Sequence, residues 1–501
     1  MTLAPLQTTS NTLGFAGQPA GLRALYFTEL WERFSYYGMR ALLVLFMVAP
    51  ITDGGLGFAT KDAGLLYGNY TMAVYMLAIP GGFIADRLLG AKRAVMIGGS
   101  AIALGHYALA VPSLTSFYAG LILIALGTGL FKPNISALVG ALYARDDARR
   151  DAGFSLFYMG INLGAFLAPL VTGTLAQSAA FKSWLSSAGF DPAKSWHWGF
   201  AAAGVGMTLA IATFAMRARD LKDPDPPGDA TGVQNSAAFR RQAAAIIFGT
   251  LALLGLALLS DLDGYANLRW LFLALPVAGI LYAARQPGGD AERLAAIGVL
   301  FIAAMIFWAV FEQAGTTISL FADQLTRTEI AGVAFPSTWF QSLNPIFVIL
   351  LAPVFAALWM RLGSRQPGPA IKFALGLVLL AASFLLMVPA AQLAASGRVS
   401  PLWLVGLFFL QTTGELLISP VGLSAMTRLA PARMTGLVLG IWFLAAAFGN
   451  KLAGVFGGAF TSADTAGLGT AFATQAAAVI AAAAVLFAVA PWVKKLSESA
   501  R

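Results

Sequence analysis

Two glutamates and two arginines lie in one stretch, Phe27 to Arg40 (FTELWERFSYYGMR), that is otherwise typical of an apolar membrane helix. At about 100° per residue, Glu29, Glu32, Arg33 and Arg40 fall on one helical face within an arc of roughly 140°, and the opposite face is apolar. The stripe rises about 16 Å, half the thickness of the hydrocarbon core of a membrane. A single ion pair does not need this length, so the stripe is a candidate path for charged ligands.

Further ionisable residues lie in the middle of other apolar segments. They are Lys132, Glu312, Glu415 and Lys451, with Asp323 near the end of its segment. An unpaired charge in hydrocarbon costs several kcal/mol, so these groups must face one another or water. The alternative is that they are buried ion pairs that hold helices together, but such pairs stabilise a protein less than apolar packing does. So many charges at depth favour a ligand site.

The depth of each charge can be estimated from the basic residue at the end of its segment, at about 1.5 Å per residue. Lys132 and Glu415 share a level at roughly 20 Å, and Arg40 and Glu312 share one at roughly 25–29 Å. This is the geometry of a central site between two repeats, closed on one side by a charge pair. A ligand charged at both ends fits it. Arg33, Arg40 and Lys132 would then face its carboxylate, and Glu415 its ammonium group.

The elements that position these charges are apolar helices. Of the 501 residues, 58% are hydrophobic and 11% are charged, and the mean hydropathy of +0.75 is too apolar for a soluble protein. We therefore expect an all-α polytopic membrane protein with fourteen transmembrane helices. The segments long enough to span about 30 Å of hydrocarbon are 22–49, 64–85, 92–111, 116–142, 153–177, 197–216, 240–260, 267–284, 293–323, 337–360, 370–390, 401–426, 434–459 and 467–493.

A proline-rich, acidic segment at 220–235 divides the chain. Six apolar segments precede it, two more follow directly, and six complete the chain. Two parallel six-helix halves are the architecture of the major facilitator superfamily, and we expect the two inserted helices to pack at its periphery. The expected domains are a six-helix bundle at 1–219, the linker and extra helices at 220–290, and a second six-helix bundle at 291–501.

A loop after the second segment, GGFIADRLLGAKR (81–93), is similar to the loop signature of that superfamily. The matching place in the second half holds ALWMRLGSRQP (357–367), which lacks the aspartate. Asp86 beside Arg87 is expected to form a gating latch on the cytoplasmic side. Basic residues that anchor a helix end at the membrane surface are the alternative.

Lysine and arginine are concentrated in alternate loops. By the positive-inside bias we expect these loops and both termini to be cytoplasmic. The net charge of +9 thus reports orientation and does not indicate a nucleic-acid partner. The chain contains no cysteine, which excludes disulfides and thiolate metal ligands, and it has no GxxxxGK[ST] loop that would bind ATP.

The charged stripe resembles a known signature. ELWERFSYYG (29–38) is similar to the ExxERFxYYG signature of the proton-dependent oligopeptide transporters, a peptide-transporter branch of the major facilitator superfamily. Two inserted helices are usual in the bacterial members of that family. Further similar blocks follow in order: LFKPNIS (130–136), FYMGINLGA (157–165), FWAVFEQAGTT (307–317), WFQSLNPIF (339–347), PAIKFALG (369–376) and GELLISPVG (414–422).

The resemblance implies roles for the matching residues. It implies that Arg33, Arg40 and Lys132 bind the peptide carboxylate, and that Glu415 and Asn344 receive the peptide ammonium group. The other implied residues are Asn162 for the peptide backbone; Tyr36, Tyr37, Tyr75, Trp308 and Trp442 for the pocket walls; Glu29, Glu32, Arg33 and Glu312 for proton coupling; and Arg40 with Glu312 or Asp323 for an outer gate.

The function implied by the resemblance is proton-coupled symport of di- and tripeptides by alternating access across the inner membrane. The chain would then be no enzyme, would use protons and no other cofactor, and would work as a monomer in the lipid bilayer. A transporter of another small solute such as nitrate is one alternative, although a small anion gains nothing from Glu415. A peptide sensor that does not transport is another.

A membrane redox enzyme is disfavoured, because the chain has only two histidines, His106 and His197, and no cysteine to hold a redox centre. We expect both histidines to be packed or interfacial. Lys451 receives no role, and we expect it to reach the membrane surface or to pair within the second half.

Overall fold

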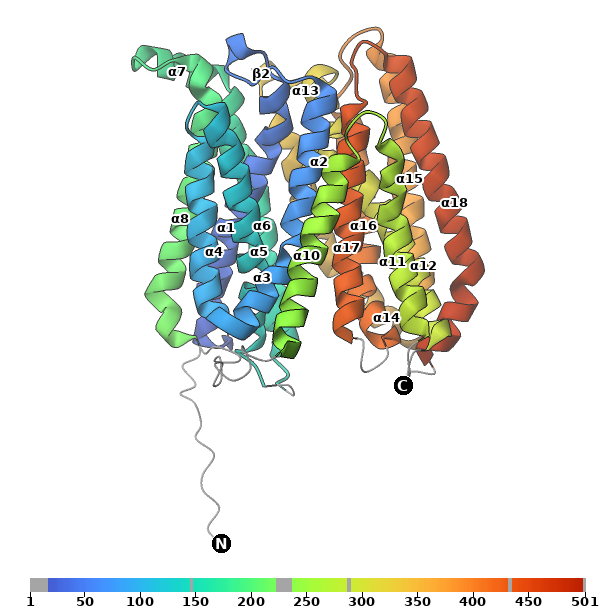
Figure 1. The fold of residues 1–501 in the computed structure, drawn as a ribbon. Helices are drawn as coiled ribbons and strands as arrows, with labels where there is room; N and C mark the ends of the chain where they lie inside the picture. The colour runs from blue at the N-terminus through green and yellow to red at the C-terminus, as the bar shows by residue number, and fades with distance from the viewer. Residues whose placement is uncertain (1–16, 145–146, 222–236, 286–289, 431–434, 499–501) are drawn as a thin grey trace.

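The computed structural model describes residues 17–144, 147–221, 237–285, 290–430 and 435–498. The expected all-α polytopic fold is confirmed, and the long helices run nearly parallel in two bundles that lie side by side (Figure 1). In the described part of the chain, ten helical segments have the length and hydropathy of a membrane span. The start of α1 (Ala20–Val48) and the end of α18 (Thr465–Glu498) lie at the same end of the molecule, which we call the terminal end. The opposite end is the distal end.

The first bundle is built from helices because only a helix satisfies every backbone polar group of an isolated segment in a membrane. Besides α1 it comprises α2 (Thr60–Met76), α3 (Ala78–Ile84), the π-helical η3 (Ala85–Leu89), α4 (Ala91–Leu109), α5 (Leu114–Gly140), α6 (Arg150–Gln177) and α8 (Ser195–Arg217). Short helices complete it: η2 (Ile51–Asp53), α7 (Ala179–Ser187), η4 (Pro192–Lys194) and η5 (Ala218–Asp220).

The second bundle follows the same plan and ends with α18. Its helices are α12 (Ala291–Phe311), η7 (Glu312–Gly315), α13 (Thr317–Gln324), η8 (Ser337–Ser342), α14 (Leu343–Leu362), η9 (Gly363–Arg365), α15 (Pro369–Ala394), α16 (Leu402–Leu429) and α17 (Thr435–Gly458). A hairpin of β1 (Glu329–Ile330) and β2 (Val333–Ala334) pairs Glu329 with Ala334 and Ile330 with Val333 near the distal end.

Two of the expected spans are not single helices. The span at 64–85 breaks between α2 and α3, because Pro80 has no N–H to donate to the carbonyl group of Met76. The span at 293–323 breaks at η7, where Thr316 leaves the helical region with φ −130° and ψ −96°. The second break places Glu312 in a short 3-10 turn.

A first seam between the two bundles runs along α2 and α17. Gly64 and Gly68 of α2 face Gly454 and Gly458 of α17, and a Cβ on Gly68 would lie 2.9 Å from the carbonyl oxygen of Lys451. Pairs of small residues four positions apart allow helix backbones to approach closely in membranes. This seam is therefore a close backbone contact between the bundles.

A second seam joins α6 of the first bundle to η8 and α14 of the second. The Ser342 hydroxyl donates a hydrogen bond to the carbonyl oxygen of Phe166 at 2.7 Å. The Trp339 indole N–H donates to the Thr174 hydroxyl at 3.3 Å. These contacts hold the distal halves of the bundles together.

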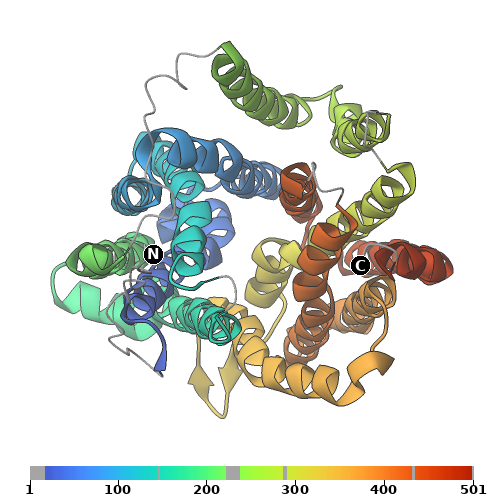
Figure 2. The same ribbon diagram turned by 90° about the horizontal axis from the view of Figure 1, so that it is seen from below.

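The two inserted helices, α10 (Ala237–Leu259) and α11 (Leu271–Ala284), lie outside both bundles (Figure 2). The 3-10 helix η6 (Ala266–Trp270) lies between them. Helix α10 packs on α2 and α3 of the first bundle, whereas α11 packs on α12 of the second. The insert therefore spans the seam between α2 and α17 from the outside.

Candidate functional site

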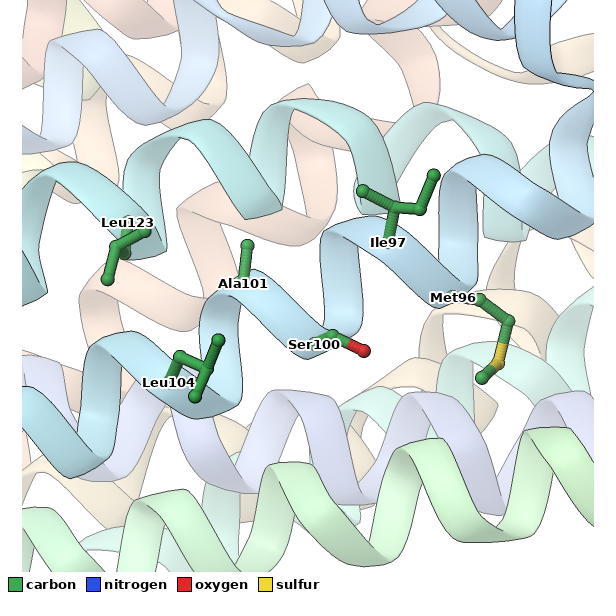
Figure 3. Close-up of a pocket in the computed structure, with 6 residues that line it drawn as sticks. All are labelled: Met96, Ile97, Ser100, Ala101, Leu104 and Leu123. Atoms are coloured by element: carbon green, nitrogen blue, oxygen red, sulfur yellow. The ribbon is translucent and has the colours of Figure 1, made fainter.

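A shallow groove of about 390 Å³ lies between α4 and α5 on the membrane-facing surface (Figure 3). Its lining is apolar apart from the hydroxyl of Ser100, and Ile97 and Leu104 are exposed beside it. A charged ligand finds no partner there. The polar and charged side chains lie instead in the interior.

The charged stripe of α1 forms a compact ion cluster. Arg33 Nε lies 2.9 Å from Glu29 Oε1 and 2.5 Å from Glu32 Oε2, and all three side chains are buried. One guanidinium therefore serves two carboxylates. Glu29 Oε2, Glu32 Oε1 and Arg33 Nη2 have no hydrogen-bond partner within the described structure, so the cluster has unused capacity for a proton or a ligand group.

Lys132 of α5 adds a cation next to this cluster. Its charge acts on Glu29 and Glu32, and its ammonium group lies 4.0 Å from the ring centre of Tyr75 of α2. The ring face offers partial negative charge without neutralising the lysine. Lys132 and Tyr75 are both only partly buried, unlike the α1 cluster, so the ammonium group stays accessible to a ligand.

Arg40 and Glu312 meet across the two bundles. The Arg40 guanidinium forms a buried ion pair with the Glu312 carboxylate through Nη2, and Arg40 Nε donates a hydrogen bond to the Tyr67 hydroxyl at 2.6 Å. Arg40 lies on α1, Tyr67 on α2 and Glu312 on η7, so three elements converge on one guanidinium. The pair lies in the distal half of the molecule.

Asp323 is not a partner of Arg40 in this arrangement. Its Oδ1 accepts hydrogen bonds from the Ser337 hydroxyl at 2.7 Å and from Gln177 Nε2 at 3.3 Å. Gln177 is the last residue of α6, so this cluster also joins the two bundles. At the distal end it forms a second contact between the bundles, in which neutral donors bind the Asp323 carboxylate.

The second bundle supplies an acid and an amide at its own inner face. Asn344 Nδ2 of α14 donates to Glu415 Oε2 of α16 at 2.9 Å and to the Thr412 hydroxyl at 3.0 Å. Glu415 and Asn344 are only partly buried. Glu415 and Tyr37 of α1 are close enough to interact electrostatically, so the acid lies within range of the first bundle. Both Glu415 and Asn344 thus keep part of their surface uncovered.

The aromatic residues expected in the pocket wall divide into two groups. Tyr36 and Tyr37 pack edge to face, 5.3 Å apart, with the Arg33 and Arg40 guanidinium groups 5.5 Å from Tyr36 and 6.0 Å from Tyr37. With Tyr75 they line the charged stripe.

The two tryptophans pack mainly inside the second bundle. Trp308 is partly buried against Phe307 and Phe311, and its indole N–H has no partner in the described structure. The Trp442 ring is buried against Phe373 at 6.2 Å. Trp308 thus has a donor left for a ligand, whereas Trp442 packs against Phe373 and Gly422 within the second bundle.

Asn162, Asp86 and Arg87 lie apart from these clusters. Asn162 is buried on α6 and donates to the carbonyl oxygen of Tyr158, one turn earlier, at 2.9 Å. Asp86 and Arg87 lie exposed on η3 at the terminal end. This end is remote from the Arg40 and Glu312 pair.

The expectation for Lys451 was wrong. Its side chain is fully buried, and its partners come from the insert and from the first bundle: Asp261 and Asn69, the latter at 2.6 Å. The reason is the close approach of α2 and α17, which seals the ammonium group away from the surface. Asp261 could not be anticipated as a partner, because it lies just beyond the end of a peripheral helix.

Both histidines are packed, as expected. His106 is buried with Nε2 2.6 Å from the Ser35 hydroxyl, and His197 Nδ1 lies 3.0 Å from the carbonyl oxygen of Leu109. The sequence interpretation missed Tyr67, Gln177 and Asn69 as members of polar clusters. The sequence indicates these residues only weakly, because a neutral polar side chain in an apolar segment does not require a partner on another helix.

The chain is similar to known transporters along most of its length. The sequence model of the POT family matches residues 92–476. The chain is 40% identical to the peptide transporter YePEPT of Yersinia enterocolitica, with 96% of each chain covered, and 40% identical to a di-/tripeptide transporter of Lactococcus lactis, with 86% of this chain and 87% of the relative covered. Its fold matches that of a peptide transporter crystallised in complex with alafosfalin, with a TM-score of 0.84, 39% identity and 96% of both chains covered.

Proposed function

Because this chain belongs to the POT family, we propose that it is a proton-coupled symporter of di- and tripeptides that works by alternating access. One observation carries the proposal: cations on the inner face of the first bundle oppose an acid on the inner face of the second. A zwitterionic peptide has the matching charges at its two ends. The match requires both bundles, so binding and the relative position of the bundles are linked.

In this proposal the peptide carboxylate binds Lys132 and Arg33, with Arg40 beyond them in the distal half. Lys132 suits this role because its ammonium group rests on the Tyr75 ring, which offers no competing full negative charge. The peptide ammonium group binds Glu415, which Asn344 holds in place by its hydrogen bond of 2.9 Å. A strong ion pair with the ligand is possible because both sites are shielded from bulk water.

The residues between these charges would contact the body of the peptide. Tyr36, Tyr37 and Tyr75 offer ring faces from the first bundle, and Trp308 offers ring and indole N–H from the second. Trp442 would support this wall through its packing within the second bundle. Asn162 would leave its local bond to Tyr158 and turn its amide toward a peptide group of the ligand.

Proton coupling would use the carboxylates that share cations. Protonation of Glu29 or Glu32 frees the Arg33 guanidinium for the peptide carboxylate, and protonation of Glu312 releases Arg40 and weakens the distal closure. One proton driven by 100 mV supplies about 2.3 kcal/mol, and one pH unit adds about 1.4 kcal/mol. Together they support accumulation of a few hundredfold.

The gates would lie at opposite ends. Arg40 with Glu312, and Asp323 with Gln177, would close the distal end, which we propose is the outer one. Asp86 and Arg87 would act in closure of the cytoplasmic end. The moving bodies would be the bundles at 1–219 and 291–501, joined by 220–290.

The protein would work as a monomer in the inner membrane, with both termini in the cytoplasm. The experiment that tests the function is counterflow of labelled dialanine in proteoliposomes, followed by uptake driven by a proton gradient. Exchange of dialanine that nitrate does not inhibit would support a peptide site. Binding without exchange would indicate a sensor and overturn the proposal.

A further inference from the structure

A triangle of hydrogen bonds joins the insert to both bundles. Asp261 Oδ2, in the turn after α10, accepts hydrogen bonds from Asn69 Nδ2 of α2 at 2.7 Å and from Lys451 Nζ of α17. Lys451 Nζ also donates to Asn69 Oδ1 at 2.6 Å. Arg269 of η6 lies 3.3 Å from Asp261 Oδ1. Each of the three corners therefore belongs to a different part of the chain.

The triangle closes at the glycine seam. Lys451 has no exposed side-chain surface, and the Asp261 side chain is only 12% exposed. A buried ammonium group needs a carboxylate partner, and of the described residues Asp261 is the acid paired with it. Gly68, the neighbour of Asn69, lies directly against the backbone of Lys451. Any rocking that changes the spacing of α2 and α17 at this level must alter the triangle.

The helices of the insert rest on different bundles, so the insert itself crosses the seam (Figure 2). On the side of the second bundle, Phe272 of α11 is buried against Phe448 of α17, with ring centres 5.2 Å apart. On the side of the first bundle, α10 is more loosely packed, and Phe248 and Leu251 are exposed. The polar corner at Asp261 is therefore a specific attachment of the insert to α2.

We propose that Asp261 makes the insert a strap across the seam of α2 and α17, and that this strap stabilises the state in which the distal end is closed. The triangle is intact in the structure in which Arg40 meets Glu312 and Gln177 meets Asp323. A contact that exists in one state and is altered in another shifts the population toward the first. The strap shares no residue with the proposed peptide or proton sites, although its effect on transport rests on the proposed function.

The test compares two variants that remove the strap with one that does not. Asp261→Leu combined with Lys451→Met removes both charges together, so that Lys451 is not left buried without its acid. Arg269 also loses its partner in this variant, but a quarter of its side chain is exposed. Asn69→Leu is the milder variant, because it keeps the ion pair and removes only the link to the first bundle. The matched control is Asp263→Asn, in the same turn. In the described structure this side chain is 98% exposed and forms a solvent-exposed ion pair of 3.4 Å with Lys61 of α2, which contributes little compared with the buried triangle.

The measurement is the distance distribution between spin labels at Thr115→Cys and Ala466→Cys, in the first turns of α5 and α18 at the distal end. The chain has no cysteine of its own, so these labels are specific. We expect both strap variants to raise the long-distance population several-fold and the control to match the unsubstituted protein. Counterflow of dialanine should change in maximal rate and keep its half-saturating concentration.

Unchanged distances in both strap variants would overturn the strap. That result is distinguishable from failure of the proposed function, in which the unsubstituted protein would show no dialanine counterflow at all. Thermal unfolding of each variant is measured in parallel. If the double variant does not fold, the distance distribution of the Asn69→Leu variant alone tests the strap.

Discussion

Arg40 and Glu312 form a buried ion pair that joins α1 of the first bundle to η7 of the second, and the Tyr67 hydroxyl accepts a hydrogen bond from the same guanidinium. Glu312 cannot leave Arg40 without reaching water or gaining a proton, and Arg40 cannot leave Glu312 without reaching water or another anion. The pair therefore links the protonation of one carboxylate to the distance between two bundles. This link is the basis of the first prediction.

Glu312→Gln is expected to abolish proton-driven accumulation of dialanine and to leave counterflow measurable. The amide cannot take up or release a proton, yet it can still accept a hydrogen bond from Arg40. The measurement is uptake into proteoliposomes with and without a proton gradient. Asp323→Asn is the comparison, since Asp323 is held by neutral groups, and it should retain accumulation. Accumulation by Glu312→Gln above the equilibrium level would contradict this role.

Glu32→Gln tests the second candidate for proton coupling. Arg33 then has one carboxylate, Glu29, in place of two, so the guanidinium is more available to the peptide, and Glu32 no longer makes this depend on pH. We expect the pH dependence of dialanine affinity to flatten and uphill uptake to fall at least tenfold. Binding is followed by thermal-shift titration between about pH 5 and pH 8. A pH profile identical to that of the unsubstituted protein would assign the proton to another group.

Glu415→Gln should weaken the binding of dialanine at least tenfold, because truncation of a shielded charge pair costs about 2 kcal/mol or more. N-acetyl-dialanine has no ammonium group, and its affinity should be the same for both proteins. Lys132→Met tests the other end of the peptide in the same way. Dialanine should bind more weakly to this variant, whereas dialanine amide, which has no carboxylate, should bind to both proteins equally. Equal losses for the acetylated and the free peptide would refute a clamp with two charged ends.

Tyr67→Phe removes one hydrogen bond to a buried guanidinium, an interaction worth about 1.5–3 kcal/mol. We expect a lower temperature of unfolding and easier opening of the distal end. Tyr70→Phe is a matched control on the same helix, because the Tyr70 hydroxyl is buried without a hydrogen-bond partner in the described structure. Comparable destabilisation by both variants would show that the hydroxyl contact with Arg40 contributes nothing specific.

Gly68→Leu should separate the bundles at the seam, because even a Cβ would lie 2.9 Å from a backbone oxygen of α17. We expect loss of both thermal stability and counterflow. Gly249→Leu on α10 is the control, since a Cβ there meets no atom within 4 Å. The two are compared by thermal unfolding and by dialanine counterflow. A stable, active Gly68→Leu variant would show that the close approach is dispensable.

The physics of charges in hydrocarbon explains what the sequence could predict. Arg40 and Glu312 were expected at one depth, because counting about 1.5 Å per residue from the basic end of each segment puts both at the same level, and a charge at that depth requires a partner. The same reasoning failed for Lys451, whose acid lies in a turn of the insert and not within a span. The role of Tyr67 was not predicted, because a hydroxyl group, unlike a charge, does not require a charged partner in the membrane. The break at η7 also escaped prediction, since the hydropathy of 293–323 is continuous.

The break between α2 and α3 divides one membrane span into a distal lever and a proximal lever, the latter at the terminal end. The distal lever, α2, is fixed to α17 by its glycines and bears Tyr67 and Asn69. The proximal lever, α3, continues into η3 with Asp86 and Arg87 and packs on α5. Because Pro80 removes one backbone hydrogen bond between the two levers, the span can bend at this level, and η3 at the terminal end need not move with α2 as one rigid rod.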